Sequence, residues 1–143
     1  RLIGGQIMDL EAEGQRLSKS QLAKIHEAKT AALLTSSLRL GAMSANATPR
    51  QLDALTEFGK SLGLAFQVID DILDVTQSTA TLGKTAGKDA QVDKATYPGI
   101  LGLDKSRQEA RRLTRKALAA LQDFRPKTTR LNELAHYLLD RDF

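Results

Sequence analysis

Three carboxylates lie close together in a strongly apolar stretch, Phe66-Gln-Val-Ile-Asp-Asp-Ile-Leu-Asp74. On a helix with about 100° per residue, Asp70 and Asp74 lie about 40° apart, and Asp71 lies about 60° to 100° from them. Like charges at this spacing repel each other, so a partly buried cluster needs a cation. Oxygen ligands without Cys or His suit Mg²⁺, which shares its remaining positions with water and phosphate. Solvated aspartates at a helix end are the alternative, and spacing alone does not separate the two.

A lysine lies on the apolar face of an earlier helical segment. On the same helical wheel, Lys29 falls within about 40° of four apolar residues, namely Leu22, Ile25, Leu33 and Leu40. Because burying an unpaired ammonium is costly, Lys29 either extends to water or meets an anion. The neighbouring Thr30 offers a hydroxyl and a backbone carbonyl that the hydroxyl can help to free from helical bonding. His26 fits a hydrogen-bonded core histidine better than a catalytic base.

A basic, glycine-containing segment comes after the aspartates, Leu82-Gly-Lys-Thr-Ala-Gly-Lys-Asp89. Its glycines free the backbone, and Lys84 and Lys88 can reach back towards the carboxylates. The segment is similar to a phosphate cradle, but it lacks the spacing of a Walker loop and no strand precedes it. Lys94 is a further candidate. A solvated basic loop is the simpler interpretation of this segment by itself.

The composition narrows the possible chemistry. The chain has 143 residues, no Cys and two His, which excludes disulfides, thiolate metal sites and cysteine nucleophiles. No apolar run reaches about 18 residues, so we expect no membrane span. The net charge of +4 favours an anionic partner. The basic cluster at 111–116 is most simply a solvated face, and without aromatic interleaving or a known motif we expect no nucleic-acid partner.

The elements that position these residues are helices. Capping residues and apolar periodicity predict an all-α fold with no strand. The expected helices are Ile3 to Leu10, Ser18 to about Ala45, Pro49 to about Thr76 with Thr48 as cap, a brief helix at Pro98, Asp104 to about Phe124, and Thr129 to Asp140. Residues 77–96 are expected to form a loop. The first residues, which enter partway into a helix without Met, suggest a piece of a longer protein.

Together these segments resemble the trans-isoprenyl diphosphate synthase family, especially bacterial farnesyl or geranyl diphosphate synthases. The matching motifs occur in the family's order and spacing over almost the whole chain. They are Gly5-Gln-Ile-Met-Asp-Leu10, His26-Glu-Ala-Lys-Thr30, Phe66-Gln-Val-Ile-Asp-Asp-Ile-Leu-Asp74, Leu82-Gly-Lys84, Gly87-Lys-Asp89 and Lys94-Ala-Thr-Tyr-Pro98. The resemblance implies the helical bundle of the isoprenoid synthases, of which residues 1–143 would be the C-terminal half.

The resemblance also implies a Mg²⁺-dependent prenyl transfer. An allylic diphosphate (dimethylallyl or geranyl diphosphate) ionises and is attacked by isopentenyl diphosphate, which gives farnesyl or geranyl diphosphate. By this resemblance the metal ligands are Asp70, Asp71 and Asp74, and the diphosphate-binding lysines are Lys29, Lys84 and Lys94. Thr30 and Gln67 would stabilise the allylic cation, Phe66 would line the homoallylic pocket, and Gln6 and Asp9 would have supporting roles. The family also implies a cytoplasmic homodimer.

The chain departs from the family pattern in two ways. Ala31 stands where the family has Gly, and the family's first aspartate-rich motif has no match in these residues. We therefore expect this chain alone to be inactive, and product length cannot be assigned. Two alternatives stay open. One is a non-catalytic helical subunit that retains the fold. The other is a class I terpene cyclase, against which the paired Lys-Thr and Gly-Lys elements argue.

Overall fold

The computed structural model describes residues 2–82, 95–124 and 129–139, except for the side chains of 77–82 and of residue 123. Within these ranges the chain is helical and has no strand, which confirms the all-α prediction. The elements are α1 (Leu2–Glu11), α2 (Lys19–His26), the π-helical turn η1 (Glu27–Ala31), α3 (Ala32–Ser44), α4 (Pro49–Leu82), α5 (Tyr97–Leu101), α6 (Leu103–Ala120), the 3₁₀ turn η3 (Gln122–Phe124) and α7 (Thr129–Leu139).

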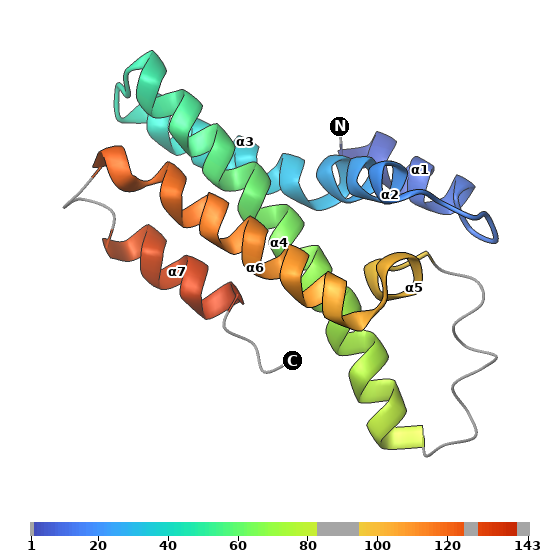
Figure 1. Cartoon of the computed structure of the whole chain (residues 1–143). Coiled ribbons are helices and arrows are strands. Elements are labelled where there is room, and N and C mark those ends of the chain that lie inside the picture. The colour runs from blue at the N-terminus through green and yellow to red at the C-terminus, as the bar shows by residue number, and fades with distance from the viewer. Residues whose placement is uncertain (1, 83–94, 125–128, 140–143) are drawn as a thin grey trace.

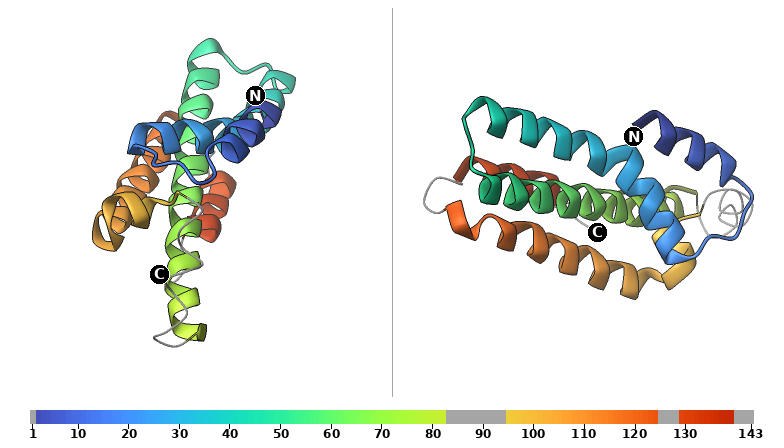
Figure 2. Two further views of the ribbon diagram at one scale, coloured as in Figure 1. Left: turned by 90° about the vertical axis from the view of Figure 1, so that its right-hand side faces the viewer. Right: turned by 90° about the horizontal axis from the view of Figure 1, so that it is seen from above.

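Helix α4 is the centre of the arrangement. It packs against α6 along one side and against α3 and η1 along the other (Figure 1). Seen from above, α3 runs along one side of α4 and α6 along the other, while α2 crosses over α4 towards α5 (Figure 2). The core has the same layering, since fully buried Phe58 and Ile72 of α4 share one apolar cluster with Leu113 and Ala117 of α6. None of the described helices is both long and apolar enough to cross a bilayer.

Local capping chemistry explains where several helices begin. Ser18 and Gln21 form a reciprocal capping box at the start of α2, in which each side chain accepts from the other's backbone N–H. Thr48 and Gln51 repeat this arrangement before α4. The Thr96 hydroxyl accepts from Gly99 N–H at the start of α5. These helix starts agree with the sequence-based prediction.

Three predicted boundaries, in two helices, were wrong. Helix α4 continues to Leu82, beyond the expected end at Thr76, because residues 77–82 contain no Gly or Pro and the first breaker is Gly83. Helix α6 begins after Gly102, whose positive φ of 81° suits the cap position, and Asp104 lies in the first turn instead of capping it. It ends at Ala120, and η3 covers 122–124.

The largest departure from prediction is η1, which interrupts the helix expected from Ser18 to Ala45. An i→i+5 bond from Ala32 N–H to the Glu27 carbonyl widens the turn. The extra residue rotates the next helical turns by about 100° relative to a continuous α-helix. Consequently the predicted apolar stripe is split. Leu22 and Ile25 are 2% and 4% exposed, whereas Leu33 and Leu40 are 55% and 65% exposed.

Candidate functional site

The π turn is held between two glycines from two different helices. A Cβ on Gly5 of α1 would lie 2.5 Å from the backbone nitrogen of Lys29, and a Cβ on Gly63 of α4 would lie 2.5 Å from Ala31 Cα. Both contacts are too short for any real side chain, so only glycine permits these close approaches. Such π turns occur frequently at functional sites. The turn that carries Lys29 and Thr30 is therefore fixed by backbone packing on both sides.

Lys29 meets an acid on α1. Its ammonium lies 2.5 Å from Asp9 Oδ2, and both side chains are partly buried, at 33% and 27% exposed. The sequence-based alternatives for Lys29 were extension to water or an anion, and in the structure the partner is a carboxylate of the chain itself. Asp9 also lines a cavity of about 220 Å³ between α1 and α2, together with Leu17 and Leu22.

Thr30 connects the π turn to the helix of the aspartates. Its hydroxyl donates to Gln67 Oε1 at 3.1 Å across the α4–η1 contact. The hydroxyl was expected to help free its own backbone carbonyl, but in the structure it donates to this amide. Gln67 lies three residues before Asp70, one turn along α4. The bond therefore brings the predicted cation-stabilising pair together beside the aspartate-bearing turns.

The three predicted metal ligands differ in their surroundings. Asp71 is buried, at 7% exposed, and its Oδ2 accepts a 2.9 Å hydrogen bond from the backbone N–H of Tyr97, the first residue of α5. Asp70 is partly exposed and Asp74 is exposed. The helical repeat places Asp70 and Asp74 on one face, whereas Asp71 points towards α5. Asp71 thus joins α4 to α5 in this structure.

Of the three predicted metal ligands, two fit the Mg²⁺ that the family resemblance implies. Among the described residues, no three His, Cys, Asp or Glu side chains converge closely enough to hold a metal ion. Mg²⁺, however, usually binds proteins through one or two carboxylates and takes its other ligands from water and phosphate. Asp70 and Asp74, one turn apart and accessible, fit that mode. A metal role for Asp71 stays a prediction.

The remaining predicted residues have mixed outcomes. Phe66 is partly buried on α4, and Gln6 is exposed on α1. Lys84 and Lys94 lie outside the described residues, as does the basic segment that contains Lys84. His26 is buried, at 4% exposed, and its ring packs 5.7 Å from that of Tyr97. This burial agrees with the prediction of a core histidine.

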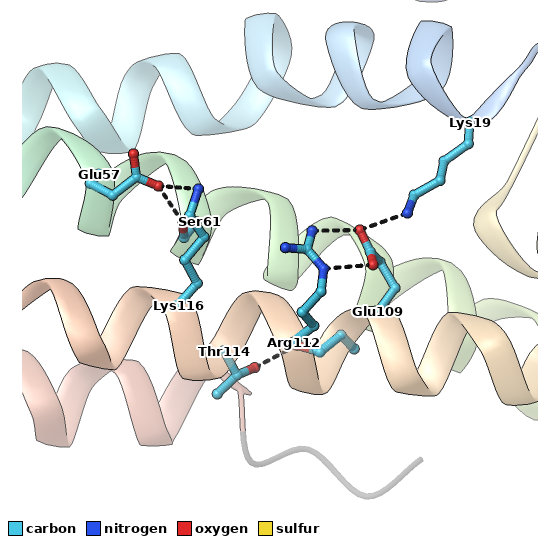
Figure 3. Close-up of polar contacts among 8 residues, drawn as sticks. Lys19, Glu57, Ser61, Glu109, Arg112, Thr114 and Lys116 are labelled. Carbon is cyan, nitrogen blue, oxygen red and sulfur yellow. Dashed lines mark hydrogen bonds and ion pairs between the residues drawn. The ribbon is translucent and has the colours of Figure 1, made fainter.

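A second set of ion pairs joins α6 to α2 and to α4 (Figure 3). Glu109 of α6 accepts hydrogen bonds from Arg112 on the same helix. The ammonium of Lys19, on α2, lies 3.0 Å from Glu109 Oε1. These two cations, Arg112 first, hold the pKa of Glu109 at about 2, against an opposing effect of burial. Lys116 pairs with Glu57 of α4 and lowers its pKa.

The basic cluster on α6 is exposed, as the solvated-face interpretation expects. It consists of Arg111, Arg112, Arg115 and Lys116. A cavity of about 540 Å³ lies beside Lys19, Tyr97 and Arg112, but its charges are already paired with Glu109. Burial, and then the charges of Glu109 and Asp71, raise the pKa of Tyr97 to about 12, so its phenol is neutral at ordinary pH.

Sequence reasoning missed the structural role of the glycines on α4. Gly59 and Gly63 are one turn apart, and a Cβ on Gly59 would lie 2.9 Å from Thr35 Cα. Two glycines at a spacing of four, inside a helix that otherwise has strong helix formers, indicate a close helix–helix approach. That spacing could have predicted the contact. Nothing in the sequence signalled the bond between Asp71 and Tyr97.

Comparison with known proteins identifies the family of this chain. The chain is 48% identical to a chloroplastic geranylgeranyl pyrophosphate synthase of Catharanthus roseus, over 99% of this chain and 40% of that protein. It is 46% identical to the farnesyl diphosphate synthase of Escherichia coli, over 99% of this chain and 48% of that protein. The chain thus spans less than half the length of these relatives.

A solved structure agrees with these sequence matches. A geranyltransferase from Helicobacter pylori, complexed with magnesium and isoprenyl diphosphate, matches with a TM-score of 0.75 and 35% identity, over 97% of this chain and 46% of that one. The polyprenyl synthetase family model matches residues 1–136. With nearly its whole length matched in sequence and in fold, the chain belongs to the polyprenyl synthetase family.

Proposed function

We propose that this chain forms the C-terminal part of a prenyltransferase domain that condenses an allylic diphosphate with isopentenyl diphosphate. The observation that carries the proposal is the Thr30–Gln67 bond, which ties the Lys29-bearing turn to α4 one turn before Asp70. The ammonium that we assign to phosphate, the Thr30–Gln67 pair and the accessible carboxylates thus belong to one side of α4. The two sequence relatives support this function over a non-catalytic subunit or a terpene cyclase, since both are prenyl diphosphate synthases.

In this proposal each residue has one task. Asp70 and Asp74 would hold Mg²⁺, whose positive charge would stabilise the allylic diphosphate, and Lys29 binds the same diphosphate. Lys84 and Lys94, which the structure does not describe, are assigned to the diphosphate by family resemblance alone. Thr30 and Gln67 present oxygen atoms to the allylic cation, and Phe66 lines the pocket for isopentenyl diphosphate.

The proposed reaction balances as a substitution with subsequent loss of a proton. The allylic C–O bond breaks, and the diphosphate leaves with the electron pair. The double bond of isopentenyl diphosphate attacks the cation to form the new C–C bond, and the proton lost afterwards goes to the departing pyrophosphate. Mg²⁺, when bound, supplies positive charge that stabilises the leaving group. Lys29 adds a fixed charge at the same group.

The chain covers less than half of each sequence relative, which limits the activity that we propose for residues 1–143 alone. Because the chain spans 40% and 48% of the two sequence relatives, we propose that residues 1–143 form the C-terminal portion of a larger domain. The active site then needs further residues for isopentenyl diphosphate and for additional metal, so the chain alone is inactive. Family resemblance supports a cytoplasmic homodimer and a farnesyl or geranyl product.

A chimaera tests this function. The C-terminal part of the Escherichia coli farnesyl diphosphate synthase, to which this chain is 46% identical, is replaced by residues 1–143. We expect the chimaera to convert geranyl diphosphate and isopentenyl diphosphate to a longer prenyl diphosphate, and the chain alone to give no product. A folded chimaera without turnover would contradict the proposal, and activity of the isolated chain would contradict the need for the missing half.

The metal assignment is tested with the same chimaera. We expect Mg²⁺ together with pyrophosphate to raise its Tm, and Asp70→Ala to abolish that rise because the shared carboxylate is gone. Asp53→Ala removes an exposed carboxylate on the same helix and is the matched control. An undiminished rise in Asp70→Ala would overturn the assignment.

A further inference from the structure

Lys29 has an internal competitor for its proposed ligand. Asp9 Oδ2 occupies one side of the ammonium, where it accepts a charge-assisted hydrogen bond. An ammonium has three donors, so this contact leaves two for a diphosphate. Family resemblance gives Asp9 nothing beyond a supporting place beside the site. The geometry of the contact gives Asp9 a more definite task.

The position of Asp9 is set by the close approach of Gly5 to the π turn. Gly5 and Asp9 are four residues apart on α1, so they lie on the same helical face. Gly5 brings that face against the backbone of Lys29. Asp9 is therefore presented to the Lys29 side chain by rigid elements rather than by a loop. Side chains held in this way position a charge more accurately than flexible ones do.

The competition has an electrostatic consequence. The Asp9 carboxylate orients the Lys29 ammonium, but its negative charge also repels an incoming diphosphate. When the anion leaves, the ammonium pairs with Asp9 again. From this geometry we propose that Asp9 is a positioning residue for Lys29, which holds the ammonium in place before diphosphate binds and weakens retention of the pyrophosphate product. This inference rests on the proposed function, because it takes Lys29 to be a diphosphate ligand.

Pyrophosphate affinity is the first measurement. The Kd of inorganic pyrophosphate with Mg²⁺ is measured by titration calorimetry for the chimaera described above and for its Asp9→Asn variant. We expect about threefold tighter binding in the variant, the size typical of one partly exposed charge pair. Glu11→Gln removes the same charge from an exposed position on α1 and should leave the Kd unchanged. In a Lys29→Gln background the ammonium is absent, so Asp9→Asn should no longer tighten pyrophosphate binding.

A spectroscopic measurement reports on the ion pair itself. The side-chain ammonium of Lys29 should give a ¹H–¹⁵N signal that is protected from exchange by Asp9. We expect Asp9→Asn to abolish this signal, Asp9→Glu to restore it, and Glu11→Gln to leave it intact. A role of Asp9 limited to folding would lower Tm without this pattern.

The outcomes separate the inference from the proposed function. If the unmodified chimaera binds pyrophosphate but Asp9→Asn binds no more tightly than Glu11→Gln, the inference is wrong and the function stands. If the Lys29 signal persists in Asp9→Asn, the inference is also wrong. If the unmodified chimaera binds no pyrophosphate, the proposed function fails, whether or not the ammonium signal of Lys29 depends on Asp9.

Discussion

The two sides of α4 use charge differently. On the α6 side, acids have several donors: Glu109 accepts from Lys19 and Arg112, and Glu57 accepts from Lys116 and Ser61. On the η1 side, the contacts of Lys29 and Thr30 each join one donor to one acceptor. A ligand can open a single pair at small cost, whereas opening a network leaves several groups unsatisfied. The first set suits a scaffold, and the second suits the binding surface that we propose.

The largest expected effect concerns the backbone contact that fixes the π turn. Gly63→Ala places a Cβ 2.5 Å from Ala31 Cα, which belongs to backbone and cannot rotate away. We expect the free energy of unfolding to fall by about 2–3 kcal/mol. Denaturant unfolding measures the change. Gly41→Ala is the control, because a Cβ there meets nothing within 4 Å, and we expect it to stabilise the helix by about 0.5–1 kcal/mol.

A second prediction separates neighbours within the aspartate motif. Asp71→Ala leaves the buried N–H of Tyr97 without this acceptor and should cost about 1–3 kcal/mol without metal present. Asp70→Ala should cost little stability, because Asp70 is partly exposed. Chemical denaturation in EDTA measures both. Equal losses in the two variants would contradict the division between a scaffold residue and a site residue.

The charge network of the scaffold predicts a pH dependence. The pKa of Glu109 is about 2 in the folded chain and 4.5 ordinarily, so the folded state favours its ionised form. The resulting stability is present above pH 4.5 and is lost as the pH falls from 4.5 towards 2. We expect Glu109→Gln to lack this part of the acid transition and to lose about 1 kcal/mol at about pH 7. Glu133→Gln, at an exposed i,i+3 pair, should keep it.

The smallest effect is expected at the exposed edge of the scaffold. Lys116 and Glu57 are 52% and 44% exposed, so their pairing is screened by water. We expect Lys116→Gln to change the free energy of unfolding by less than about 1 kcal/mol. A double-mutant cycle with Glu57→Gln measures the coupling. A coupling above that value would place this pair with the network around Glu109, whose side chain is only 11% exposed.

The variants at Asp9 and Asp70 complete the comparison from the binding side. If charge removal at Asp9 strengthens anion binding, while charge removal at Glu109 only weakens folding, the two sides of α4 have separate roles. If both removals only weaken folding, the η1 side is scaffold as well.

The sequence determined much of this protein. Ser18, Thr48 and Thr96 determine helix starts, because capping depends on a few neighbouring atoms. The apolar period determines the all-α class, and the spacing of four between Asp70 and Asp74 places both on one helical face. These properties are local, so residue types and spacing are sufficient to predict them.

Only the tertiary structure decided the rest. The π turn exists where Gly5 and Gly63 press on it from two helices, and no pattern within 18–45 contains that information. It rotates Leu33 and Leu40 to the surface, which a continuous helical wheel could not predict. The partners of Lys29 and Asp71 likewise come from other helices. Contacts between segments distant in sequence depend on how the helices pack, and packing is a property of the whole fold.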